Sequence, residues 1–159
     1  MRRPCLSSNK LIVAVIGGHK CEQKVGEIGE KIGKFLAEVG AIVVCGGLGG
    51  VMERVSKGCH EAGGLTVGIL PGEDKAAANA YIDIPIPTGL GYTRNTIVAA
   101  CADIVIALPG EYGTLSEIAF ALNMKKPVIG IGSWDIKGMK QVKTAQEAIE
   151  KVKEIAGLR

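Results

Sequence analysis

Apolar residues along the chain form short continuous runs, separated by longer segments in which apolar positions recur every three or four residues. The continuous runs are residues 11–16, 41–45, 65–70, 103–108 and 127–131. Such runs, rich in Val and Ile, are typical of strands buried on both faces of a parallel sheet. Residues 81–87 alternate Ile with other residues and predict a sixth strand. Pro85 within this segment indicates an edge position or a strand end.

Helical periodicity fills the intervals between these strands. Apolar residues from Val25 to Val39 recur at helical spacing, and Gly40 follows as a helix-ending residue. Thr144 and Glu147 have the spacing of a capping box, which predicts the start of a last helix. Further helical segments are predicted after the glycines at 46–50, over residues 97–102, between residues 108 and 127 and, as a loop or a short helix, over 72–80.

The strand–helix–strand order predicts a Rossmann-like, doubly wound α/β fold. We expect a mostly parallel sheet of about six or seven strands with helices on both faces. The 159 residues suit one ligand-binding domain, 1–159, in which residues 1–10 are an N-terminal tail. In such sheets ligands bind outside the carboxyl ends of the strands.

Composition narrows the class of partner. Apolar residues make up 47% of the chain and charged residues 22%, and the net charge of +3 is mild. The basic residues do not cluster and only six residues are aromatic, so we expect no nucleic-acid partner. The apolar run at 11–16 is too short for a signal peptide core or a membrane span, so we interpret it as a strand and expect no membrane partner.

The five cysteines are odd in number and never form a C-x-x-C pair. A disulfide framework or a zinc site is therefore not expected, and a reducing cytoplasm fits this usage. Cys45 and Cys101 are interpreted as small core residues. The pair Cys59–His60 is too small a set for a metal, and we predict no metal site.

Four turns follow predicted strands and meet at one edge of the sheet. They are residues 17–20, 45–50, 88–95 and 109–117. These turns hold much of the chain's glycine, which at 23 of 159 residues is about double the usual share of roughly 7%. They also hold most of the polar residues that suggest chemistry.

In the turn at 109–117, Gly113 and Thr114 are predicted to open a helix. The first amides of a helix lack internal partners, and the helix dipole adds positive charge there, so a phosphate could approach Gly113. Thr114 could add its hydroxyl. The alternative is that Thr114 and Glu117 form only a capping box, with Glu117 satisfying a backbone amide.

The turn at 45–50 repeats this design, although Met52 occupies the third Gly position of a dinucleotide-binding motif and no P-loop Lys follows. Two such turns on one edge predict a ligand with phosphate or other oxyanion groups. Arg94 could pair bidentately with such a group, or it could be solvated. His19 could contact the ligand, or it could simply face solvent.

Taken together, the motifs GGLGGVM, GYTRN and LPGEYGTLSE resemble the superfamily of LONELY GUY-type cytokinin-activating phosphoribohydrolases, often mislabelled lysine decarboxylases. This superfamily also contains molybdenum-cofactor carrier proteins. The enzymes carry P-G-G-x-G-T-x-x-E and, upstream, an Arg-Lys pair. The matching positions here are Pro109 to Glu117 and Arg94–Asn95.

For the enzymes, the resemblance implies that Arg94 and Glu117 are a catalytic pair that cleaves the N-glycosidic bond of a nucleoside 5′-monophosphate, with no cofactor required. Two departures are present: Asn95 replaces the Lys, and Glu111 replaces the second Gly. If that position needs a positive φ, Glu costs roughly 1 kcal/mol. The Arg-Asn form and the short chain look more like the carrier branch, which implies molybdenum cofactor as a bound ligand.

We therefore expect a cytoplasmic binding protein for a small phosphorylated, nucleotide-like ligand, similar to a molybdenum-cofactor carrier. A phosphoribohydrolase is the alternative, and a regulatory nucleotide sensor is a third possibility. The resemblance also implies a homodimer or a larger homo-oligomer. The predicted ligand-binding residues are Gly18, His19, Gly46, Gly47, Gly49, Gly50, Met52, Arg94, Asn95, Pro109, Gly110, Tyr112, Gly113, Thr114 and Glu117.

Overall fold

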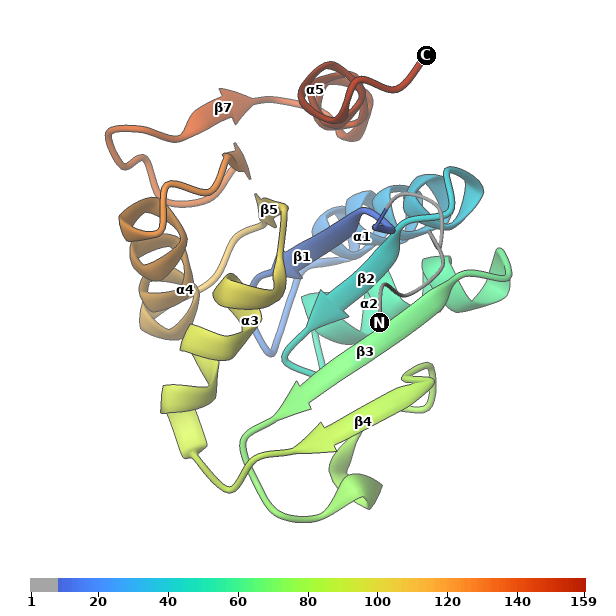
Figure 1. Cartoon of the computed structure of the whole chain (residues 1–159), viewed down its shortest axis with the longest axis vertical. Helices are drawn as coiled ribbons and strands as arrows, with labels where there is room; N and C mark the ends of the chain where they lie inside the picture. The colour runs from blue at the N-terminus through green and yellow to red at the C-terminus, as the bar shows by residue number, and fades with distance from the viewer. Residues whose placement is uncertain (1–8) are drawn as a thin grey trace, which may run out of the picture.

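In the computed structural model of the chain, which describes residues 9–159, seven strands form one parallel sheet (Figure 1). The strand order is β4-β3-β2-β1-β5-β6-β7. Most of the predicted N-terminal tail, including Cys5, lies outside the described residues. The strands are β1 (Ile12–Ile16), β2 (Ile42–Cys45), β3 (Leu65–Leu70), β4 (Ile84–Pro87), β5 (Ile104–Ala107), β6 (Val128–Ile131) and β7 (Lys140–Val142).

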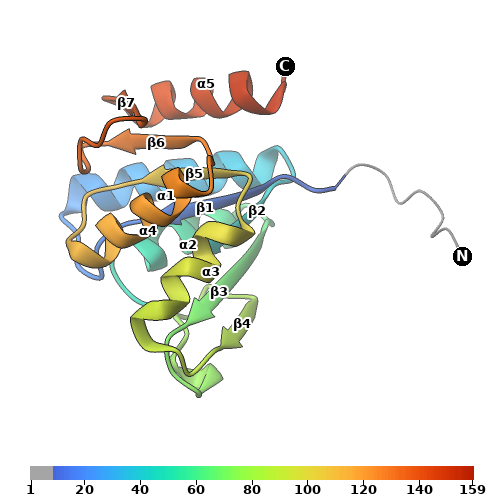
Figure 2. The same cartoon turned by 60° about the vertical axis from the view of Figure 1, so that its left-hand side comes forward.

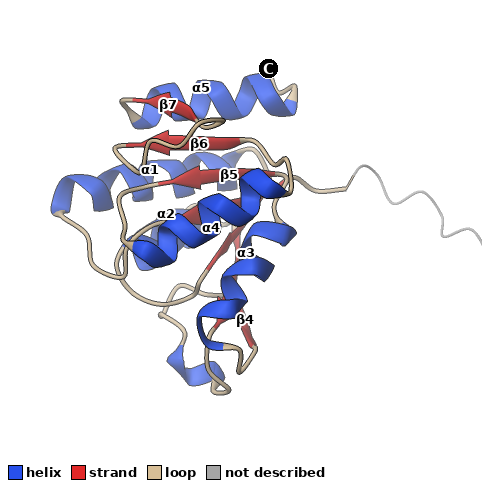
Figure 3. Ribbon diagram, turned by 90° about the vertical axis from the view of Figure 1, so that its left-hand side faces the viewer, coloured by secondary structure: helices blue, strands red, loops and turns tan. Residues whose placement is uncertain are grey.

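Residues 9–159 also form five α-helices and two short 3₁₀ segments, which lie between the strands except for α5, which follows β7. Helices α1, α2 and α5 pack on one face of the sheet, and α3 and α4 pack on the other (Figure 3). The prediction of a doubly wound α/β fold is confirmed. The helical elements are α1 (Gln23–Glu38), α2 (Val51–Glu61), η1 (Lys75–Ala77), η2 (Gly91–Arg94), α3 (Asn95–Cys101), α4 (Tyr112–Asn123) and α5 (Ala145–Ala156).

Alternate residues along the strands contribute side chains to two separate hydrophobic cores, one on each face of the sheet. Val13 and Val15 of β1 face α1 and α2, whereas Ala14 and Ile16 face α3 and α4. These β1 side chains are almost completely buried, because β1 lies in the middle of the sheet with helices on both sides. This explains why the strand appears in the sequence as a continuous apolar run.

The two edges of the sheet differ in how well the sequence predicted them. β4 is an edge strand, as Pro85 indicated. β7 forms the opposite edge, beside α5 (Figure 2), and the sequence did not predict it. Its three residues, Lys140 to Val142, carry no apolar run, and the strand is defined by pairing with β6. The predicted start of α5 is confirmed, because Thr144 Oγ1 accepts from Glu147 N (3.1 Å).

Helices α1 and α2 approach each other closely through glycines. A Cβ at Gly33 would overlap the carbonyl oxygen of Val55, and one at Gly58 would overlap the carbonyl oxygen of Glu30. These glycines therefore serve helix–helix packing, a role that the sequence interpretation of glycine as a turn residue did not include.

The two cysteines predicted to be core residues differ. Cys45 at the end of β2 is fully buried, as predicted. Cys101 at the end of α3 is exposed, so its assignment to the core was wrong. The reason is the helical face: Val98, Ala99 and Ala102 pack against the sheet, and Cys101 is not among these packed residues. Within residues 9–159, no helix is long and apolar enough to cross a membrane.

Candidate functional site

The order of the strands reverses between β1 and β5, and the turns that follow these two strands are in direct contact. Gly18 N donates a hydrogen bond to Pro109 O (2.9 Å). A Cβ at Gly110 would lie 2.8 Å from Gly18 N and would overlap the side chain of Thr114. This point of reversal is where open α/β sheets bind ligands.

The turn after β2 contacts the same two turns, and the three turns with the side chains packed against them form one cluster. Val51 N donates to Gly18 O (2.9 Å). Gly50 has a φ of 64°, and a Cβ there would overlap Gly18 O. Gly50 is therefore required for the close approach of the two turns. Gly46 and Gly47 lie in the same turn and are buried.

Arg94 at the end of η2 connects the ends of β2 and β3. Its Nε donates to Ile69 O (2.8 Å) and its Nη2 to Gly46 O (3.5 Å), and its Nη1 donates to Asn95 Oδ1. The alternative of a solvated Arg94 was wrong, because only 7% of the residue is exposed. Within residues 9–159 these partners are neutral, and Arg94 forms no ion pair.

Glu117 is the carboxylate of the cluster. It lies on α4 and is only 7% exposed, and it makes no side-chain hydrogen bond to the residues that the structure describes. Burial raises the pKa of Glu117 to about 8, against the opposing effect of Arg94. Burial also lowers the pKa of Arg94, and Glu117 opposes that change. The two groups thus form an interacting pair without direct contact.

The alternative that Thr114 and Glu117 form a capping box was wrong. Helix α4 begins at Tyr112 and its N-cap is Glu111, so Thr114 lies inside the helix. Leu115 N donates to Glu111 O (3.0 Å), and the amides of the three residues before it open the helix. Such amides have no intrahelical acceptor and favour an anion.

Asn95 and Glu111 occupy the two positions that depart from the enzyme motif. Asn95 is buried and holds α3 against α4, because its Nδ2 donates to Ser116 Oγ (3.0 Å) and Gly113 O (3.4 Å). Glu111 is exposed and has a φ of −98°. The expected cost of a positive φ at Glu111 therefore does not arise.

The other predicted site residues have different surroundings. His19 is exposed beside the cluster, and Met52 is buried against Gly46. A Cβ at Gly113 would meet only Asn95 Nδ2 at 3.8 Å, and one at Gly49 would meet only His19 O at 3.4 Å. At these two glycines the fold leaves room for an additional atom.

Trp134, in the loop between β6 and β7, belongs to this cluster and was missed from the sequence. Its Nε1 donates to Gly110 O (3.1 Å) and Glu111 O (3.2 Å), and its ring stacks with that of Tyr112. A signal was present: Trp134 follows a predicted parallel strand, and the rule that selected the other four turns applies equally to the end of β6.

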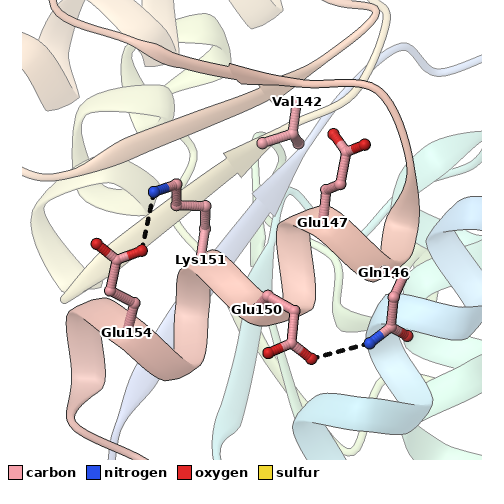
Figure 4. Close-up of a pocket in the computed structure, with 6 residues that line it drawn as sticks. All are labelled: Val142, Gln146, Glu147, Glu150, Lys151 and Glu154. Carbon is pink, nitrogen blue, oxygen red and sulfur yellow. Dashed lines mark hydrogen bonds and ion pairs between the residues drawn. The ribbon is translucent and has the colours of Figure 1, made fainter.

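Two other kinds of site come into question in the described chain: a metal site, and an anion site in a surface groove. Residues 9–159 contain no group of three or more His, Cys, Asp or Glu that could hold a metal ion. A surface groove between β7 and α5 contains none of the predicted residues (Figure 4). Three of its six lining residues are acidic, which does not favour an anion. The lining residues are Val142, Gln146, Glu147, Glu150, Lys151 and Glu154.

The fold and this cluster define a doubly wound α/β domain with a buried cation at the carboxyl edge of its sheet. The chain belongs to the SLOG cluster4 family, whose model matches residues 10–158. The LOG-like superfamily suggested by the motifs is thereby confirmed.

Relatives and solved structures extend this assignment. An uncharacterised protein of Archaeoglobus fulgidus is 40% identical over 144 residues, covering 86% of this chain and 91% of its own length. A cytokinin riboside 5′-monophosphate phosphoribohydrolase of Arabidopsis thaliana is 39% identical over 79 residues, which is 48% of this chain but only 35% of that enzyme.

Two structures match nearly the whole chain. The molybdenum cofactor binding protein of Rippkaea orientalis is 34% identical with a TM-score of 0.88, and covers 94% of this chain and 99% of its own. The molybdenum cofactor carrier protein of Chlamydomonas reinhardtii is 33% identical with a TM-score of 0.86 and the same coverage.

Proposed function

We propose that the chain is a binding protein for a phosphate-containing, nucleotide-like ligand, of the molybdenum-cofactor carrier type. The observation that carries this proposal is the buried guanidinium of Arg94 at the carboxyl edge of the sheet, at the ends of β2 and β3. Within residues 9–159 it is bonded to neutral acceptors and forms no ion pair. A buried cation without an ionic partner is costly, so an anionic ligand group would stabilise it.

The residues present fit the phosphate of molybdenum cofactor. The amides that open α4 and the space beside Gly113 suit an oxyanion. Arg94 would add a positive charge close by. Glu117 does not exclude an anion, because its raised pKa keeps the carboxyl group largely neutral below pH 8.

Two observations favour the carrier type over the enzyme: the share of each relative's length that this chain matches, and the neutral Asn95. The two molybdenum-cofactor proteins match this chain over almost their full length, whereas the plant enzyme matches over about a third of its length. The position that is Lys in the enzymes is here a buried amide engaged with Ser116 and Gly113.

A phosphoribohydrolase is the second candidate, and Glu117 favours it. A buried carboxyl group that interacts with Arg94 could stabilise the positive charge that develops on ribose as an N-glycosidic bond breaks. The activity requires the ionised form, so its rate would rise with pH toward the pKa of about 8.

One set of measurements separates these functions. Purified protein is incubated anaerobically with molybdenum cofactor, and retained molybdenum and pterin are quantified after gel filtration. In parallel, release of free base from AMP and isopentenyladenosine monophosphate is followed by chromatography. Retention of cofactor without base release supports the carrier, and base release that Glu117→Gln abolishes supports the enzyme. Tight AMP binding with neither result supports a nucleotide sensor.

Arg94 is tested by comparing AMP with adenosine. We expect Arg94→Ala to weaken AMP binding about 10-fold or more and adenosine binding much less, because a charge-assisted hydrogen bond to phosphate is lost. Lys34→Ala, on the outer face of α1, is the control with an equal change in charge. Circular dichroism checks that each variant is folded, and Arg94→Lys replaces Arg94→Ala if the latter is not. An equal loss for both ligands would contradict the proposal.

We also propose that the protein is cytoplasmic and forms a homodimer or a larger homo-oligomer. Ile84 and Ile86 on the edge strand β4 are 43% and 42% exposed, which supports an association surface there. Light scattering coupled to gel filtration measures the oligomeric state, and a monomer at micromolar concentration would contradict this proposal.

A further inference from the structure

An aromatic pair lies directly beside the turn that opens α4. Tyr112, the first residue of α4, is 81% exposed. Its ring lies 6.2 Å from that of Trp134 between centroids, with the two planes 29° apart. The Trp134 indole N–H is bonded to the carbonyl groups of Gly110 and Glu111. Trp134 thus holds the turn and supports one face of Tyr112.

A second exposed ring flanks the same junction. Tyr92 in η2 is 83% exposed and precedes Arg94 by two residues. The hydrogen bond from Asn95 Nδ2 to Gly113 O holds the end of η2 close to the start of α4. Tyr92 and Tyr112 therefore come from the two segments that meet where Asn95 contacts Gly113.

Isolated exposed aromatic rings are ordinary on a protein surface. Tyr112 differs in two ways: its ring is supported by Trp134, and it adjoins the amides that open α4. Aromatic side chains in such positions stack on planar heterocycles, and this interaction is tolerant of the identity of the ring.

We infer that Tyr112, positioned by Trp134, stacks on the planar ring of the ligand whose phosphate binds beside Gly113 and Arg94. The ligand class is then a phosphorylated planar heterocycle, either a nucleobase or a pterin, and not a simple sugar phosphate. This inference rests on the proposed function, because it assumes that the phosphate binds at the start of α4.

The test compares three probes by isothermal titration calorimetry: AMP, neopterin monophosphate and ribose 5-phosphate. Tyr112→Ala should weaken the binding of at least one ring-bearing probe about 10-fold or more, as loss of one stacked ring does. It should leave ribose 5-phosphate within about twofold of wild type. Tyr112→Phe keeps the ring and should restore the affinity, whereas Tyr112→Leu should not. The ring-bearing probe with the larger loss identifies the source of the heterocycle.

Trp134 supplies an independent readout, because it is the only Trp of the chain. A ring that stacks on Tyr112 should change the Trp134 fluorescence with the same dissociation constant that calorimetry gives, and ribose 5-phosphate should change it less. Trp134→Phe keeps an aromatic support but removes the two hydrogen bonds. It should therefore weaken the ring-bearing probes and ribose 5-phosphate alike, through the displaced turn.

The outcomes separate this inference from the proposed function. If wild type binds ribose 5-phosphate and the ring-bearing probes, and Tyr112→Ala weakens none or all of them equally, the stacking inference is wrong and the phosphate site stands. If wild type binds no phosphorylated probe, including molybdenum cofactor, both fail. A change from dimer to monomer in Tyr112→Ala, with all affinities retained, would assign Tyr112 to an interface and overturn the inference.

Discussion

Glycine serves different purposes in the α1–α2 interface and at the carboxyl edge of the sheet. In the interface, the missing Cβ of Gly33 and Gly58 lets the backbone of one helix contact the other. At the edge, a Cβ would meet its nearest atom outside the local backbone at 3.4 Å for Gly49 and at 3.8 Å for Gly113. The first pair is explained by packing within the chain, and the second pair is not.

This difference shows how glycine content should be interpreted. A high glycine count alone supports neither a binding site nor a tightly packed helix pair. A neighbour that a Cβ would overlap marks a glycine required by the fold. Open space beside a glycine at a helix start marks one that is available to a ligand.

The largest effect is expected in the α1–α2 interface. Gly33→Ala should lower the free energy of unfolding by about 3 kcal/mol, the upper part of the range for overpacking, because the helix backbones must separate. The melting temperature should fall by about 6–12 °C for a chain of this size. Gly29→Ala is the matched control on the same helix, since its Cβ would meet its nearest atom, Val55 N, at 3.6 Å.

Calorimetry measures both variants. Gly29→Ala should be neutral or stabilising by up to about 1 kcal/mol, because Ala is the better helix former. Equal destabilisation of the two variants would contradict the assignment of Gly33 to a close helix contact.

The second effect is a dependence of folding stability on pH, caused by Glu117 at the carboxyl edge of the sheet. The folded-state pKa of Glu117, about 8, exceeds the ordinary value of 4.5, so between these values the folded state binds a proton that the unfolded state releases. Wild type should therefore lose stability progressively relative to Glu117→Gln as pH rises from 4.5 to 8. Below pH 4.5 and above pH 9 the difference should be constant.

Urea unfolding of both proteins across this pH range measures the effect. Glu38→Gln, an exposed carboxyl group on α1, controls for the change in net charge. Parallel stability curves for wild type and Glu117→Gln would show that the folded-state pKa of Glu117 is not raised.

The smallest change in stability is expected at Gly113, where the change in binding should be clear. Gly113→Ala should alter the free energy of unfolding by less than about 1 kcal/mol, since the site has room and Ala suits a helix. The same methyl group should weaken AMP binding about 10-fold, because it occupies the space beside the amides that the proposed phosphate needs.

Gly110→Ala is the comparison within the same turn. A Cβ at Gly110 would overlap Thr114, so this variant should lose stability as well as affinity. If Gly113→Ala binds AMP like wild type, the phosphate does not lie at the start of α4.

Most of the fold could be predicted because the central strands are buried on both faces. The run at residues 11–16 is continuous and apolar because β1 has a helical layer on each side. β7 could not be found this way, since an exposed edge strand of three residues needs no apolar pattern. Cys101 was misassigned because a residue's neighbours in sequence do not determine which face of a helix it occupies.

The sequence determined the class of fold and the four turns that contact one another, because apolar periodicity selects the elements and parallel strands bring their carboxyl ends to one edge. Only the tertiary structure decided how the side chains at that edge are used. It buried Arg94 among neutral carbonyl groups, placed Thr114 inside a helix and raised the pKa of Glu117. It also brought Trp134 onto the turn at Gly110. Burial and contacts between distant segments arise only when the chain packs, so residue type and spacing do not contain them.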